Sequence, residues 1–140
     1  MALPMVDAWT DIRDWLGANA PGTPATLRPR LQRHLATAHV VKVFNNITFW
    51  HLASLARPAG AAGAPDRSAL PIAGDDPAAK AAVTRLLDAI GYDTVDAGPL
   101  GSGGRRFQFG TRAFVAPYGG LSDQRGTPAR VAVVRTALGA

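Results

Sequence analysis

The apolar run at positions 40–44 constrains the fold more than any other stretch of this chain. Val40, Val41, Val43 and Phe44 follow one another almost without interruption. Such a run is typical of a strand that helices cover on both faces, so we expect an interior parallel strand here. A polar corner, Asn45-Asn46, ends the run. We expect Asn46 to cap a helix over residues 47–57.

Two further strands and the helix between them are predicted downstream. Residues 69–73 and 92–97 read as short strands, and Asp76 followed by Pro77 is a strong signal for the start of a helix. The apolar residues of that helix recur on one face, and it ends at Gly91, where a left-handed conformation is needed. Asp75 and Asp76 are interpreted as capping residues and not as a catalytic pair.

The order of these elements predicts an α/β fold. Parallel strands joined by helices give a partial Rossmann-like parallel sheet of about three strands, flanked by helices. Residues 1–37 are predicted to form a helical N-terminal segment, with helices over 5–16 and 27–36. Residues 38–140 carry the sheet.

The last third of the chain is less regular. Residues 98–104 are rich in glycine but lack the Gly-Lys-Ser/Thr ending of a phosphate loop, so we expect a mobile loop. The aromatic residues of the next segment are expected to pack on the sheet; they are Phe107, Phe109, Phe114 and Tyr118. A final helix is expected from Thr127 and Pro128 onward, with a strand as the alternative because its residues are often β-branched.

Composition excludes several classes of protein. The chain has no cysteine, so disulfide scaffolds and thiolate sites are excluded, and its three histidines are too irregularly spaced for a metal site. No apolar run is long enough to cross a bilayer, so we expect a cytoplasmic protein without membrane contact. The net charge is +5, but the arginines are scattered along the chain and aromatic residues are sparse, so no nucleic-acid partner is expected. No catalytic side chain is identified.

The polar corner is the best candidate for a ligand contact. In open parallel sheets, ligands bind beyond the carboxyl ends of the strands, where Asn45 and Asn46 would lie. A turn that only caps the next helix remains an alternative for these two residues.

Three segments in order carry a resemblance to a known family. They are VVKVFNN, RPAGAAGAPDRSALPIAGDDPAAKAAV and LLDAIGYDTVDAGPL. Together they resemble the carboxyl half of the Rossmann domain of NADP oxidoreductases that depend on the deazaflavin coenzyme F-420. The resemblance implies that residues 38–140 are the carboxyl-terminal part of a Rossmann-like NAD(P)-binding domain. It also implies hydride transfer between NADP(H) and a deazaflavin or flavin coenzyme.

The same resemblance implies which residues contact the coenzymes. Phe44, Asn45, Asn46 and Thr48 would edge the ring site. Gly98, Pro99 and Leu100 would approach the second coenzyme. Holding two rings face to face needs little acid–base chemistry from the protein, which agrees with the absence of a catalytic constellation.

The chain also departs from this family. Residues 1–38 contain no GxGxxG turn, the motif that binds the pyrophosphate of a dinucleotide. We therefore expect a truncated member, with an open sheet edge where further strands would pair. The alternative is a non-catalytic Rossmann-like remnant that uses this edge as a homo- or hetero-oligomerising interaction module.

Overall fold

The structure is a computed structural model that describes residues 32–139, so most of the predicted N-terminal segment lies outside the described residues. Its core is a three-stranded sheet in the order β1-β2-β3. The strands are β1 (Val41–Lys42), β2 (Ala69–Gly74) and β3 (Asp93–Asp96). The helices are α3 (Phe49–Ser54), α4 (Pro77–Ile90), α5 (Leu100–Arg105), the 3₁₀ helix η1 (Ala116–Tyr118) and α6 (Val131–Ala137).

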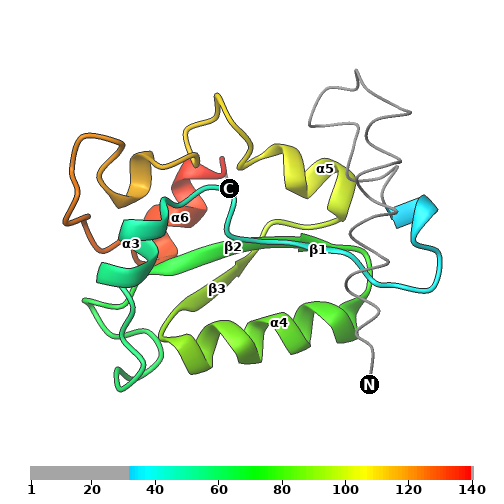
Figure 1. Cartoon of the computed structure of the whole chain (residues 1–140), viewed down its shortest axis with the longest axis horizontal. Coiled ribbons are helices and arrows are strands. Elements are labelled where there is room, and N and C mark those ends of the chain that lie inside the picture. Colours follow the sequence, from blue (N-terminus) through cyan, green and yellow to red (C-terminus); the bar gives the residue numbers. More distant parts are fainter. Residues whose placement is uncertain (1–31, 140) are drawn as a thin grey trace.

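The sheet is the middle of three layers. Figure 1 shows α4 on one side of the strands and α5 and α6 on the other. All six residues of β2 are buried, as expected for a central strand covered on both faces. The predicted α/β class with flanking helices is confirmed.

The second and third strands pair in parallel, as predicted. Ala69 aligns with Asp93 and Ile72 with Asp96. The fourteen residues of α4 span about 21 Å, which matches the length of a six-residue strand and carries the chain back to the start of the sheet. The Asp76 side chain caps α4 by accepting from the Ala79 N–H, which confirms its predicted role.

The first two strands pair antiparallel, so the prediction of an all-parallel sheet with β1 inside it is wrong. Val41 aligns with Gly74 and Lys42 with Ala73, and within residues 32–139 β1 pairs on one side only. The connection between β1 and β2, residues 43–68, turns directly after β1 and contains one short helix, α3. It leaves the chain at the end of the sheet where β1 stops, so β2 runs back in the opposite direction.

Pro71 explains why β1 is so short. The carbonyls of Ser68 and Ile72 accept hydrogen bonds from the β3 side, so the backbone of Pro71 faces the β1 side. A continued antiparallel register would place Phe44 opposite Pro71. Proline has no N–H to donate there, so the ladder ends before that pair.

Residues 98–104 are mostly helical, which corrects the prediction of a mobile loop. Helix α5 begins at Leu100 directly after Pro99. Gly103 lies so close to the preceding strand that an added Cβ atom would sit 2.5 Å from the Ala97 carbonyl oxygen. The glycines of this stretch therefore allow a helix to pack tightly on the sheet.

The predictions for the C-terminal segment are confirmed in part. The last helix is confirmed as α6, and Phe107 and Tyr118 are fully buried. Phe109 is 81% exposed, so the prediction that it packs on the sheet is wrong. Leu86, predicted for the core face of α4, is also exposed. Among residues 32–139, no helix combines the length and the apolar character that crossing a bilayer requires.

Burial of both tyrosines predicts a loss of stability in alkali. Desolvation raises the pKa of Tyr92 to about 12, although the charge of Arg57 lowers it in part, and burial also raises the pKa of Tyr118. A group with a raised folded pKa contributes full stability below its unfolded pKa, about 10, and loses it above that value. We therefore expect unfolding to become easier from about pH 10 upward. The chain has two tyrosines, so tyrosinate absorbance followed against pH reports both.

The matched variants for this test are Tyr92→Phe and Tyr118→Phe. Each removes a hydroxyl that donates to a backbone carbonyl, of Leu52 and of Ala69 respectively, at 2.7 Å. We expect each to cost about 1 kcal/mol at neutral pH and to reduce the alkaline loss. Free titration of both phenols near pH 10 in the folded protein would contradict the assignment.

Candidate functional site

The structure divides the residues predicted to bind coenzymes into two groups at opposite ends of β2. Asn46 contacts the Tyr118 hydroxyl, which donates to the carbonyl of Ala69 at the start of β2. The Gly98 carbonyl instead accepts from Gly74 at the other end of β2. The antiparallel pairing causes this division, because the carboxyl ends of β1 and β2 point in opposite directions.

The segment Phe44–Thr48, here called the asparagine corner, contains strained backbone. Phe44 has φ 67° and Val115 has φ 50°, and they are the two non-glycine residues with positive φ in the described part of the chain. Both lie next to Asn46, since the Val115 N–H donates to the Asn46 carbonyl at 2.9 Å. Such conformations are costly for bulky and β-branched residues. Both strained backbone conformations therefore lie in or against the asparagine corner.

The two asparagine side chains hold the following segment against the corner. The Asn45 amide donates to the Phe107 carbonyl at 3.0 Å, and the Asn46 amide donates to the Ala113 carbonyl at 2.9 Å. Asn46 does not cap the next helix as predicted. That role belongs to Thr48, whose hydroxyl accepts from the His51 N–H.

Three amide oxygens near this corner are buried without a hydrogen-bond partner. They are Oδ1 of Asn45, Oδ1 of Asn46 and Oε1 of Gln108. Asn46 is completely buried, and Gln108 follows directly the residue that Asn45 holds. Unpaired buried acceptors are rare and costly, so each calls for a donor from water or from a ligand. The corner can therefore accept hydrogen bonds from an N–H-bearing group.

The second predicted group has structural contacts of its own. The Gly98 N–H donates to an Asp96 carboxylate oxygen, and the Leu100 N–H donates to Asp75 Oδ1 at 2.9 Å. Pro99 starts α5, and its carbonyl accepts from Gly103. The structure therefore gives these residues roles in joining β3 to α5. Asp75 thus accepts at the start of α5, whereas the sequence had placed both aspartates at the start of α4; only Asp76 has that predicted role.

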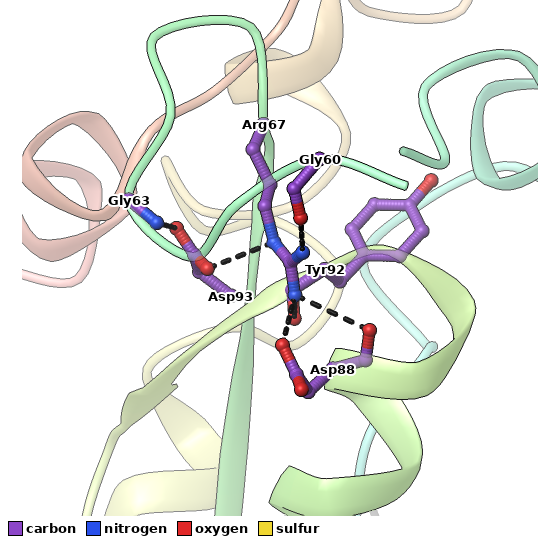
Figure 2. Close-up of polar contacts among 6 residues, drawn as sticks. All are labelled: Gly60, Gly63, Arg67, Asp88, Tyr92 and Asp93. Atoms are coloured by element: carbon purple, nitrogen blue, oxygen red, sulfur yellow. Dashed lines mark hydrogen bonds and ion pairs between the residues drawn. The ribbon is translucent and has the colours of Figure 1, made fainter. Parts of the chain in front are cut away.

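A second polar cluster surrounds Arg67, which is only 2% exposed (Figure 2). Its guanidinium group donates to the Gly60 and Tyr92 carbonyls and to Asp88. Its Nε atom lies 2.9 Å from Asp93 Oδ1 as an ion pair. This one side chain thus connects the 58–67 loop, the end of α4 and the start of β3.

A shallow surface pocket of about 270 Å³ adjoins this cluster. Its lining comprises Ala62, Thr84, Arg85, Asp88, Tyr92, Asp93 and Thr94. Asp88 and Asp93 are both already paired with Arg67. This leaves no free carboxylate pair for acid–base chemistry, so we interpret the cluster as structural.

Comparison with known proteins adds no family to these observations. No family model, curated protein or solved structure matches the chain. Among the described residues there is no group of three or more histidine and acidic side chains that could hold a metal ion. The candidate site therefore rests on the geometry of the asparagine corner.

Sequence reasoning did not find Val115, Gln108 or Arg67. Val115 contacts the corner from more than sixty positions away, Gln108 follows the residue that Asn45 binds, and no local pattern marks either. Arg67 stands at the end of a loop rich in proline and glycine, and its carboxylate partners are 21 and 26 positions further on. Only the folded chain brings these groups together.

Removing the Arg67 charge should destabilise the fold strongly. We expect Arg67→Met to lower the free energy of unfolding by about 3–5 kcal/mol, because Asp93 would keep a largely buried charge without a partner. Arg57→Met is the matched control, since the Arg57–Asp66 pair is exposed and should contribute about 1 kcal/mol or less. Urea unfolding measures both. Equal losses in the two variants would show that Arg67 is not the central contact.

Proposed function

We propose that this chain forms one wall of a hydride-transfer site, in which a nicotinamide ring lies beside the asparagine corner. The coenzymes would be NADP(H) and a deazaflavin such as coenzyme F-420, or a flavin. A hydride passes from the reduced nicotinamide to the second ring, so NADPH is oxidised and the deazaflavin or flavin is reduced. The observation that carries the proposal is the coincidence of backbone strain and unpaired buried acceptors at Phe44–Asn46.

The chemistry of the nicotinamide fits these acceptors. Its carboxamide group carries two N–H donors, and Asn45 and Asn46 each hold an oxygen without a donor. Strained backbone and unsatisfied polar groups concentrate at binding sites, where a ligand compensates their cost. The hydride chemistry itself belongs to the coenzymes, so the protein needs to supply position and a dry surface.

The direction of β1 in the sheet indicates where further strands would complete the site. Doubly wound folds often combine parallel strands with an antiparallel one. Strands added along the free side of β1 and parallel to it would end beside the asparagine corner, which is where such folds bind ligands. Gly98–Leu100 lie at the other end and are not part of this proposed ring site.

Titration with NADPH tests the proposal. We expect the full chain to change NADPH fluorescence, and the 3-acetylpyridine analogue of NADP, which lacks the N–H donors, to bind more weakly than NADP by roughly 2- to 10-fold. Asn45→Ala should remove that preference, because it deletes one acceptor. Thr84→Ala on α4 is the matched control and should preserve it. Absence of any NADPH binding at high protein concentration would rule out the proposal.

A second candidate, an interaction module, is favoured by the free side of β1. Backbone N–H and C=O groups alternate in direction along a strand. Those of Lys42 face β2, and those of Val41 and Val43 point to the free edge of the sheet. An unpaired strand edge is a template for pairing with another chain. The chain would then associate through β1 without performing chemistry.

Oligomeric state distinguishes this second candidate. If β1 pairs with another copy of the chain, light scattering should show dimers that increase with protein concentration. Lysine residues disfavour edge pairing, so Val43→Lys should shift the protein toward the monomer. A monomer at all concentrations, in the wild-type chain, would contradict self-association through β1.

A further inference from the structure

Basic residues accumulate in the last third of the chain. Residues 98–139 contain six arginines and one aspartate. They form α5, the following loops and α6, and these helices lie on the side of the sheet opposite α4 (Figure 1). This segment therefore carries a net positive charge.

Five arginines of this segment are free to meet a ligand. We call them, together with Phe109, the arginine face; they are Arg105, Arg112, Arg125, Arg130 and Arg135. All five arginines are exposed, and none forms an ion pair with a carboxylate of residues 32–139. The single acidic residue of this segment, Asp123, accepts from the backbone of its own loop instead. Arg106 is excluded because it already binds the Leu138 and Ala97 carbonyls.

An exposed aromatic ring lies in the same segment. Phe109 is 81% exposed and meets Phe114 edge-on, with ring centroids 5.4 Å apart. Arg112 stands between these two phenylalanines in the sequence. A large apolar ring held in water costs free energy unless a partner covers it.

Against the expectation from the sequence alone, we infer that the arginine face binds single-stranded nucleic acid, with a base stacked on Phe109 and the arginines along the phosphates. Exposed guanidinium groups without ion pairs and an exposed aromatic ring in the same segment are the two features that single-strand binders combine. Helices α5 and α6 have six and seven residues, too short for the long amphipathic surface that membrane binding uses. This inference is independent of the hydride-transfer proposal, because the asparagine corner contributes no residue to it.

The salt dependence of binding to a fluorescein-labelled oligothymidylate tests the inference. Fluorescence anisotropy of the full chain should rise on binding, with an affinity that falls steeply as salt increases. The double variant Arg130→Gln/Arg135→Gln should reduce the slope of log affinity against log salt by about 1.4, since each lost contact contributes about 0.7. Arg85→Gln on α4 is the matched control and should leave the slope unchanged.

Phe109→Ala tests the stacking contact separately. We expect it to weaken binding by roughly 5- to 150-fold with little change in the salt slope. Leu86→Ala, an exposed apolar residue on α4, is its control and should bind as the wild type does. Circular dichroism confirms that each variant is folded.

Three outcomes would overturn the inference. They are no binding of the oligonucleotide at low salt, an equal effect of Arg85→Gln and the double variant, or binding to anionic phospholipid vesicles with none to the oligonucleotide. Loss of NADPH binding has no bearing here, so the two proposals fail independently.

Discussion

The end of the sheet at which the chain re-enters after each strand determines the architecture of this protein. Helix α4 runs the length of the sheet and returns the chain for the parallel pairing of β2 with β3. The connection that contains α3 leaves the chain at the end of the sheet where β1 stops, so β1 and β2 run in opposite directions. This difference in strand direction determines the position of the asparagine corner and its separation from Gly98–Leu100. Within residues 32–139 it also leaves one side of β1 free.

Local sequence patterns were sufficient to predict the main helices and strands but not the direction in which the strands pair. Asp76 and Gly91 mark the ends of α4 in the sequence, because a cap and a left-handed residue have strong local signals. No local pattern marks the direction of β1, and the 47–57 segment, predicted to be helical throughout, forms a helix only at Phe49–Ser54. The glycines of residues 98–104 led to the wrong prediction of a loop. Gly103 is instead required because the helix packs so closely on the sheet that a side chain would not fit.

The candidate site was predictable only to the level of a polar corner. The position of Asn45 and Asn46 after an apolar run identified it, and the structure adds what the sequence lacks, namely contacts across more than sixty positions. The same explanation applies to the charges. Helices α5 and α6, which include Arg105 and Arg135, are far apart in the sequence, and only the stacking of layers brings these two helices to one side of the sheet.

Pro71 has an effect beyond its own position. It denies the first strand a donor where Phe44 would otherwise align, and the chain turns away at that point. The absence of an amide hydrogen on Pro71 in the central strand thus determines where β1 ends. If a residue with an amide hydrogen replaced Pro71, the pairing of β1 with β2 would extend past Lys42, and Asn45 and Asn46 would be drawn into it and away from the Phe107 and Ala113 carbonyls that they now bind.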